Sequence, residues 1–341
     1  MSLSLPHIGA LPAGVRNSIA DVAGVTVGHA TLAGGAIQSG VTVVRPHAGD
    51  PFLDKVPAAS VVLNGFGKSI GLVQVGELGV LETPIALTNT FAVGAVAQAQ
   101  IRQAVAANPQ IGRAWSTVNP LVFECNDGYL NDLQAFAVQD VHYDAAYAAA
   151  GQAFEQGAVG AGRGMSSFGV KGGIGSASRV VTLADGAQRT VGALVLSNFG
   201  VTKNLTLGGR NVGAELAKAL AASTPEPEKG SIIMLLATDA PLDARQLRRL
   251  ALRAGAGLAR TGSVFGHGSG DIALAFSTAY TVPHEGARAM PAVAMTHESH
   301  LDPLFQAAAD SVEQAIVHAL FHATAVTGRD GNARRALTEL L

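Results

Sequence analysis

The sequence STPEPEKG at residues 223–230 runs directly into SIIMLLA at residues 231–237. The first segment is polar and rich in proline, which is typical of an exposed linker. The second is a nearly continuous apolar run, the pattern of a strand that is covered on both faces. The junction therefore predicts that Ser231 is the first residue of a buried central strand and lies next to an exposed segment.

Short apolar segments with β-branched residues alternate with alanine-rich segments on both sides of this junction. The first kind predicts strands at 25–27, 41–45, 58–63, 120–124, 179–183 and 190–196, with a hairpin turn at Asp185-Gly186. The second kind predicts helices at 92–106, 143–156, 212–222, 244–260 and 304–327. Because the two kinds are mixed without strict βαβ alternation, we expect an α+β fold in which helices cover packed sheets.

The composition favours one large layered domain over residues 1–341. Hydrophobic residues make up 48% of the chain and charged residues 14%, against about 25% charged in an average protein. So few charges favour a thick core and an oligomer that hides further apolar surface. The 41 glycines stand in short clusters, which indicates tight turns.

Several classes of protein are disfavoured by the same numbers. The net charge is −2 and aromatic residues are 5%, so we expect no nucleic-acid partner. No apolar run reaches membrane-spanning length, and residues 1–7 lack the pattern of a signal peptide. With one cysteine, Cys125, no internal disulfide can form. A soluble cytoplasmic protein without a membrane partner is the expectation.

Familiar motifs of cofactor and metal sites are incomplete in this chain. The run Gly67-Lys68-Ser69 resembles the end of a phosphate-binding loop, but Val62 stands where that loop needs glycine. Ser269 is not in a nucleophile elbow, because His267 precedes it by two residues. The run HESH at 297–300 lacks the spacing of a zinc protease. His318 and His322, one helical turn apart, leave a metal site open as the weaker alternative to a pair with no role.

Four Gly-Ser pairs occur in the chain, with their glycines at 175, 230, 262 and 268. Most such pairs are ordinary turns. Only the pair at Gly230 joins a predicted linker to a predicted buried strand. An N-terminal nucleophile needs that arrangement, since the Ser231 hydroxyl must first attack its own preceding carbonyl. The α-amino group released by cleavage has a pKa near 8, so it can act as the base for its own hydroxyl.

Motifs along nearly the whole chain resemble one family, the L-aminopeptidase/D-esterases or β-peptidyl aminopeptidases, which are related to the nylon-oligomer hydrolases. These motifs are GVRNSIADV (14–22), NGFGK (64–68), ELG (77–79) and LETPI (81–85), SFG (167–169), KGGIG (171–175), SNFG (197–200), GSII (230–233), ATDAPL (237–242), GSGDI (268–272) and AFST (275–278). The resemblance implies a four-layer αββα sandwich of the N-terminal-nucleophile-hydrolase type. It also implies autocleavage between Gly230 and Ser231, into fragments 1–230 and 231–341.

The resemblance also assigns catalytic roles. Ser231 would be the nucleophile, and Asn198 would donate a hydrogen bond to the oxyanion. Ser269 and Asp271 would form a polar relay that orients Ser231 and its amino group. Without the resemblance, Asn198 is an ordinary asparagine at a strand end, and Ser269 and Asp271 belong to a glycine-rich turn.

Three further residues would form the substrate pocket. Glu124 would pair with the free ammonium of the substrate, although a carboxylate that ends an apolar strand is more often a surface residue. Lys171 and Tyr129 would line the pocket, because a lysine and a tyrosine stand in these regions of the nylon hydrolases. Cys125 is interpreted as a small core residue. No metal or cofactor is implied.

The reaction implied is acyl transfer to water: an aminopeptidase, amidase or esterase acting on small peptides, amides or esters with a free amino group. One alternative is a self-cleaving acyltransferase of the ornithine acetyltransferase type, in which an amine replaces water. A more distant one is a ligand-binding protein that stays a single chain. The preference among L-α-, D- and β-amino acyl groups stays open. The resemblance also implies a homo-oligomer of four αβ heterodimers.

Overall fold

The computed structural model describes residues 4–220 and 230–341. Apart from Gly230, the predicted linker at 223–230 therefore lies outside the described residues. So do the last residues of the helix predicted at 212–222.

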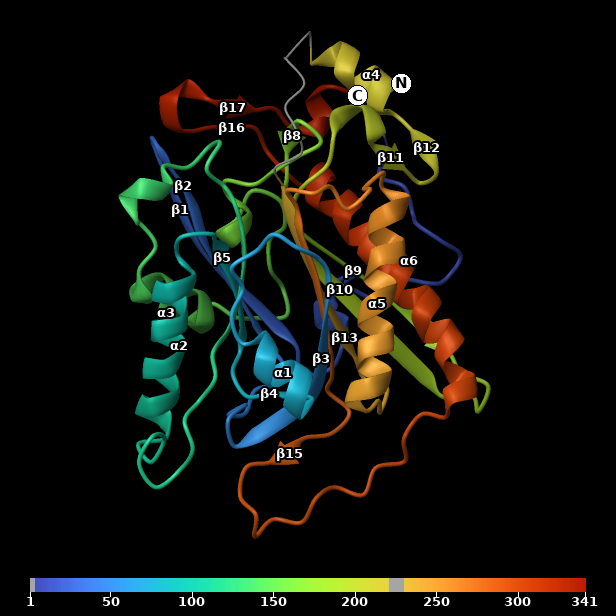
Figure 1. Ribbon diagram of the computed structural model, residues 1–341. Helices are drawn as coiled ribbons and strands as arrows, with labels where there is room; N and C mark the ends of the chain where they lie inside the picture. Colours follow the sequence, from blue (N-terminus) through green and yellow to red (C-terminus); the bar gives the residue numbers. More distant parts are fainter. Residues whose placement is uncertain (1–3, 221–229) are drawn as a thin grey trace.

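Two sheets form the centre of the fold (Figure 1). The larger sheet has the order β15-β3-β14-β13-β10-β9, and β4 pairs with β3. Its strands are β3 (Asp54–Gly65), β4 (Val80–Leu81), β9 (Gly173–Thr182), β10 (Gln188–Asn198), β13 (Ser231–Thr238), β14 (Gly270–Ser277) and β15 (Val282–Pro283). Neighbours are antiparallel except for the central pair, β13 and β14, which is parallel.

The smaller sheet has the order β1-β2-β5-β6. Its strands are β1 (Thr26–Gly34), β2 (Ile37–Arg45), β5 (Ile85–Asn89) and β6 (Leu121–Cys125). The other short strands are β7 (Ser166–Ser167), β8 (Val170–Lys171), β11 (Thr206–Leu207), β12 (Arg210–Asn211), β16 (Val326–Thr327) and β17 (Ala333–Arg334). The α-helices are α1 (Leu72–Leu78), α2 (Val93–Ala107), α3 (Asp140–Ala148), α4 (Gly213–Ala219), α5 (Ala244–Arg260) and α6 (Leu301–Phe321).

Three apolar interfaces hold the layers together. The two sheets face each other through side chains such as Leu87, Phe123, Leu194 and Leu235. The outer face of the smaller sheet packs on α2 and α3, and that of the larger sheet packs on α5 and α6. Figure 1 shows the same sequence of layers, with α2 and α3 on one side and α5 and α6 on the other. The predicted αββα sandwich is confirmed.

Strand β13 explains the apolar run that follows Gly230. All of its residues are buried. Ile232, Met234 and Leu236 belong to the interface with the helices, whereas Ile233, Leu235 and Ala237 belong to the interface between the sheets. Because side chains alternate along a strand, Ser231 shares the side of Ile233 and faces the smaller sheet.

Most predicted elements are confirmed, and one is wrong over half its length. Helix α5 begins and ends at the predicted residues, and the Asp185-Gly186 turn joins β9 to β10, with Gly186 at φ 82°. The helix predicted at 143–156 instead ends at Ala148. Gly151 exchanges two main-chain hydrogen bonds with Val27, of 2.9 and 3.1 Å. Because Gly151 pairs with β1, the chain leaves the helical conformation before this residue.

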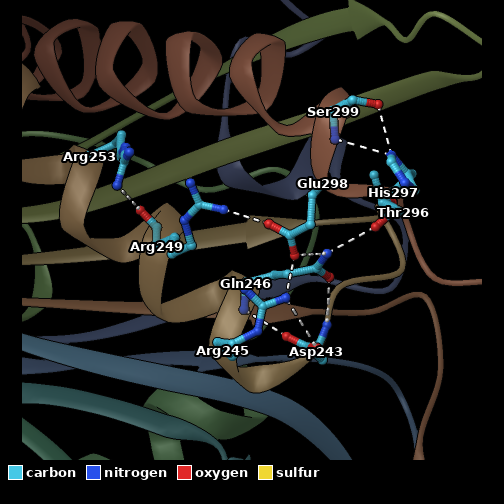
Figure 2. A network of polar contacts seen from close by, with 9 residues as sticks. All are labelled: Asp243, Arg245, Gln246, Arg249, Arg253, Thr296, His297, Glu298 and Ser299. Carbon is cyan, nitrogen blue, oxygen red and sulfur yellow. Dashed lines mark hydrogen bonds and ion pairs between the residues drawn. The ribbon is translucent and has the colours of Figure 1, made fainter.

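A long segment without helix or strand, residues 284–297, runs between β15 and α6 at the end of the sheets that lies away from Ser231 (Figure 1). It is tied at both ends by main-chain bonds, from His284 N to Leu53 O (2.8 Å) and from Thr296 N to Pro241 O (2.9 Å). Glu298 then binds the side chains of Arg245, Gln246 and Arg249 on α5 (Figure 2).

Three residues of the HESH run at 297–300 take part in this anchor or in the turn that follows it. Figure 2 shows the His297 ring beside Ser299, and its Nδ1 accepts the Ser299 main-chain N–H at 3.2 Å. His297 is thus the cap of the short turn that leads into α6. Over residues 4–220 and 230–341, no helix is both long and apolar enough to cross a membrane.

Candidate active site

Ser231 lies where three strands of the larger sheet meet. It is directly opposite Asn198 in the antiparallel β10–β13 pair and beside Gly270 in the parallel β13–β14 pair. Its side chain is nearly covered, with the residue 5% exposed. Its Oγ accepts a hydrogen bond of 3.1 Å from the Gly270 main-chain N–H. The structure thus places an amide, a hydroxyl and a main-chain N–H side by side.

The residue before Ser231 has to be glycine for a steric reason. A Cβ on Gly230 would lie 2.1 Å from Asn198 O and 2.6 Å from Phe199 Cα. Both atoms belong to the main chain of β10 and the residue after it, so neither can turn away as a side chain could. Gly230 is therefore pressed against the strand that carries Asn198.

The amide of Asn198 is held in one orientation. Its Oδ1 accepts a hydrogen bond of 2.8 Å from the Ser166 main-chain N–H, and its Nδ2 donates one of 2.9 Å to Asn126 O. A main-chain N–H can only donate, so the bond from Ser166 identifies the amide oxygen. Since Nδ2 carries two hydrogens, these bonds leave one N–H that can be directed at a substrate.

Ser269 and Asp271 are brought together next to this group. Ser269 Oγ donates a hydrogen bond of 2.6 Å to Asp271 Oδ1, and both residues are fully buried. The turn that precedes them is fixed by Asn64, whose Nδ2 donates to Gly266 O (2.6 Å) and to Ser269 O (2.7 Å). Gly270 joins the pair to Ser231, because it stands between Ser269 and Asp271 in the chain.

Glu124 is a buried carboxylate, not a surface one. It is the penultimate residue of strand β6 and is 2% exposed. Its Oε1 accepts a hydrogen bond of 2.8 Å from the Lys68 main-chain N–H. A Cβ on Gly67 would make ordinary contacts with Glu124 Oε1 at 3.5 Å and with Ile272 Cδ1 at 3.7 Å. The loop at 66–68 therefore covers the carboxylate.

The same loop reaches the neighbourhood of Ser231. A Cβ built on Gly270 would lie 2.5 Å from Phe66 O and 3.2 Å from Ser231 Oγ. Phe66 N also donates to Ser269 O at 3.3 Å. One short loop thus touches both the strand end beside Ser231 and the carboxylate of Glu124.

Cys125 is the core residue that the sequence predicted. It is fully buried between the sheets, and its Sγ donates to Leu196 O at 3.6 Å. Burial raises the pKa of the Cys125 thiol well above its usual value, and the charges of Glu124, Asp271 and Asp127 add to the effect. Carboxylates from two segments of the chain, residues 124–127 and Asp271, therefore lie near this thiol.

Asp127 is a second buried acid, three residues after Glu124. It is 1% exposed, and its Oδ1 accepts from Asn131 Nδ2 at 3.0 Å. Burial raises the pKa of Asp127 to about 7, against the opposing effect of hydrogen bonds from Ser39 and Asn131. The only sequence signal was its place in the polar run after Glu124.

Lys171 has partners other than those expected of a pocket residue. It is fully buried, and its Nζ donates to the carbonyl oxygens of Gly162 (2.8 Å), Met165 (2.7 Å) and Gly172 (2.8 Å). An ammonium has three N–H donors, so a direct contact with substrate would require one of these bonds to break. Burial lowers the pKa of Lys171 well below its usual value, whereas the nearby Asp127 raises it.

Tyr129 lies over the β16–β17 hairpin. The guanidinium of Arg334 stands 3.6 Å from the centre of its ring, and Asn332 Nδ2 donates to its carbonyl oxygen at 3.0 Å. The ring also packs against the small apolar cluster of Leu130, Ala158 and Val326. Its predicted contact with substrate stays a prediction.

His318 on α6 is a core residue, whereas His322 is exposed and caps the end of the helix. His318 Nδ1 is 2.6 Å from Ser176 O, and burial lowers the pKa of His318 to about 4. Its ring meets that of His322 edge to face, with centroids 5.5 Å apart. Within the described part of the chain, no group of three or more His, Cys, Asp or Glu side chains could hold a metal ion.

Comparison with known proteins identifies relatives over nearly the whole chain. The model of peptidase family S58 matches residues 17–334. The β-peptidyl aminopeptidase BapA of Sphingosinicella microcystinivorans is 39% identical over 352 residues, which cover 96% of this chain and 87% of that protein.

Two solved structures share the fold. A protein of Pyrococcus horikoshii OT3 superposes with a TM-score of 0.92 at 47% identity, covering 97% of this chain and 94% of the other. The L-aminopeptidase D-Ala-esterase/amidase of Ochrobactrum anthropi gives a TM-score of 0.89 at 36% identity, covering 98% and 94%. That enzyme is described as a prototype of the serine aminopeptidases and as a variant of the Ntn hydrolase fold.

Proposed function

The chain belongs to peptidase family S58, and from this premise we propose that it cuts itself between Gly230 and Ser231 and then uses the new N-terminal Ser231 as its nucleophile. It is a serine aminopeptidase of the N-terminal-nucleophile type, with amidase and esterase activity. Small peptides, amides and esters are its substrates. The comparisons favour this hydrolase over the acyltransferase alternative, because the named relatives are aminopeptidases.

Self-cleavage begins with attack of Ser231 Oγ on the carbonyl carbon of Gly230. The C–N bond breaks, the hydroxyl proton passes to the departing nitrogen, and residue 230 is left as an ester on Oγ. Water then hydrolyses the ester to give a carboxylate on Gly230 and a free amine on Ser231. The contact of Gly230 with the main chain at Asn198 supports this step, since it holds the bond to be cut against β10.

The mature enzyme would use its own amine as the base. The α-amino group takes the proton of Ser231 Oγ as the oxygen attacks the substrate carbonyl, and the second N–H of Asn198 stabilises the resulting oxyanion. The ammonium then gives its proton to the leaving amine or alcohol. Water hydrolyses the acyl-enzyme by the same steps in reverse order.

The Ser269–Asp271 pair would orient that amine. The proton of Ser269 is engaged with Asp271, so the remaining capacity of the hydroxyl is to accept a hydrogen bond. An N–H of the Ser231 amine is a suitable donor. This arrangement would keep the amine lone pair directed at Oγ.

Glu124 would bind the free ammonium of the substrate. One of its oxygens is occupied by the Lys68 N–H, which leaves Oε2 for a cation. A carboxylate that is 2% exposed is costly without a charged partner. The requirement for an amino terminus follows from this site, together with Tyr129 at its predicted edge. An oligomer of αβ heterodimers belongs to the same proposal, in line with the low share of charged residues.

The observation that carries the proposal is the register that sets Ser231 opposite Asn198 and beside Gly270. Intact mass and N-terminal sequencing of the purified active enzyme test it. We expect two fragments, the second beginning at Ser231. A fully active enzyme that remains one uncut chain contradicts the proposal.

A further inference from the structure

The peptide group that joins Met165 to Ser166 is hydrogen-bonded on both sides. Its carbonyl oxygen accepts from Lys171 Nζ at 2.7 Å, and its N–H donates to Asn198 Oδ1 at 2.8 Å. Two polar side chains from different segments are therefore linked through one rigid planar unit. One of them is a buried cation, and the other is the proposed oxyanion donor.

Such a chain of hydrogen bonds has a direction. A positive charge at the carbonyl oxygen draws electron density toward it, which makes the N–H of the same peptide a stronger donor. That N–H acts on Asn198 Oδ1, and the amide of Asn198 passes the effect to its own N–H groups in the same way. The last donor in this series of hydrogen bonds is the Asn198 side-chain N–H that would bind the oxyanion.

The segment around this peptide has little freedom to move. Lys171 also holds the carbonyls of Gly162 and Gly172. The Ser167 Oγ lies 2.8 Å from Ser197 Oγ, and Phe168 N donates to Phe199 O at 3.0 Å. The hairpin of β7 and β8 is thus fixed against the end of β10 on both sides of Asn198.

We propose that Lys171 is a positioning residue for Asn198, which it fixes and polarises through the Met165–Ser166 peptide without touching the substrate. This inference rests on the proposed role of Asn198. It replaces the expectation that Lys171 lines the pocket. The proposal also gives a reason for the buried cation. An apolar side chain of similar size would avoid the cost of desolvation, so the charge is explained by its effect on Asn198.

Arg179 on β9 provides a matched control. It is also fully buried and also donates to main-chain carbonyls, those of Ile8 (2.7 Å) and Ser178 (2.7 Å). It pairs with Val191 on β10, roughly 23 Å along the strand from Asn198 at about 3.3 Å per residue. Loss of this cation should cost stability without reaching the oxyanion.

A double-mutant cycle tests the proposal, with rates expressed per cleaved subunit counted by intact mass. We expect Lys171→Met to lower kcat by roughly tenfold to a hundredfold, with KM changed by less than about twofold. In the Asn198→Ala background the same substitution should change kcat by less than about twofold, because the two residues act in series. Arg179→Met should lower Tm and leave kcat unchanged.

Three results overturn the inference. One is that the effects of Lys171→Met and Asn198→Ala multiply, which means independent roles. Another is that Arg179→Met lowers kcat as much as Lys171→Met. The third is that Lys171→Met raises KM alone, as a pocket residue would. If Asn198→Ala leaves kcat unchanged, the proposed role of Asn198 in binding the oxyanion is itself contradicted.

A second variant covers the case in which Lys171→Met does not fold. Lys171→Arg keeps the charge but cannot place three N–H groups on the same three carbonyls, because a guanidinium is planar. We expect it to lower kcat in the wild-type background and to have little effect once Asn198 is alanine. A multiplicative effect in that cycle also contradicts the inference.

Discussion

Glu124 Oε1 accepts a hydrogen bond of 2.8 Å from the main-chain N–H of Lys68. One oxygen of this buried carboxylate is therefore satisfied by the protein itself, and the other defines where a cation can bind. A substrate ammonium would therefore bind at Oε2 of this carboxylate.

The first prediction concerns Glu124→Gln. Wild-type enzyme should prefer alanine amide to N-acetylalanine amide by about tenfold to a few hundredfold in kcat/KM, because acetylation leaves the buried carboxylate unpaired. Glu124→Gln should remove most of that preference and leave self-cleavage intact, since cleavage involves no external ammonium. Steady-state rates with the two amides measure it. If the preference survives, the ammonium binds elsewhere, and Asp127 is the next residue to change.

Gly67→Ala should weaken the same site without loss of fold. The added methyl would lie 3.5 Å from Glu124 Oε1 in ordinary contact, so the chain can accept it, but the methyl narrows the approach to the carboxylate. We expect KM for free-amine substrates to rise by about three- to tenfold, with acetylated substrates unaffected. Gly76→Ala on α1 is the control, because a Cβ there meets nothing within 4 Å. An unchanged KM would show that substrates do not pass Gly67.

Ser231→Ala should give an uncut and inactive chain. Ser231→Cys should still cleave, because a thiol is the stronger nucleophile. Mass spectrometry over a time course after purification measures cleavage, and amide hydrolysis measures activity. Normal turnover by Ser231→Ala would identify another residue as the nucleophile.

Gly230→Ala should slow self-cleavage although it replaces none of the catalytic side chains. Its methyl would require Asn198 O or the scissile peptide to move, since 2.1 Å is far below van der Waals contact. We expect the precursor to persist at least about tenfold longer than in wild type, because a small misplacement of a nucleophile is costly. The half-life of the uncut chain reports this. Cleavage at the normal rate would show that the contact is relieved before the reaction.

The stability of the fold should depend on the titration of Asp127. Its pKa is raised by burial from 3.8 to about 7, so between these values the folded protein binds more protons than the unfolded chain. Stability from this group is therefore lost as pH rises from about 4 to 7. Burial lowers the pKa of His29 and His318 to about 4, and each gives the opposite slope between about 4 and 6.5.

Asp127→Asn isolates the contribution of the acid. The Tm of the variant relative to wild type should increase between pH 4.5 and pH 8, because only wild type must bury a carboxylate at the higher pH. Differential scanning calorimetry at both values measures the change. A Tm difference that is the same at both pH values would mean that Asp127 is ionised throughout.

The sequence predicted the layers well because their signals are local. The apolar run after Gly230 is buried on both sides, and α5 carries its own boundaries, with Asp243 as its cap. The end of α3 was misjudged because Gly151 pairs with Val27, a contact far away in the chain.

The same distinction applies to the site. Ser231 could be located from its place between two kinds of segment. The roles of Asn198, Ser269 and Asp271 came from family resemblance, since their common neighbourhood is created by the order of strands in the sheet. The burial of Glu124 and the carbonyl partners of Lys171 depend on loops that fold over them. No spacing in the sequence encodes those contacts.

The order of strands in the larger sheet also constrains what the two predicted products can do. Strand β13 would begin the second fragment, yet its neighbour β10 belongs to the first, and β14 of the second fragment pairs in turn with β3 of the first. Strands of the two fragments are therefore interleaved within one sheet. Severing the chain would remove one covalent bond but no interface, so the two fragments should stay associated after cleavage. Self-cleavage would also be irreversible and would follow folding. The larger sheet must assemble before the bond can break, and each molecule can be cut only once.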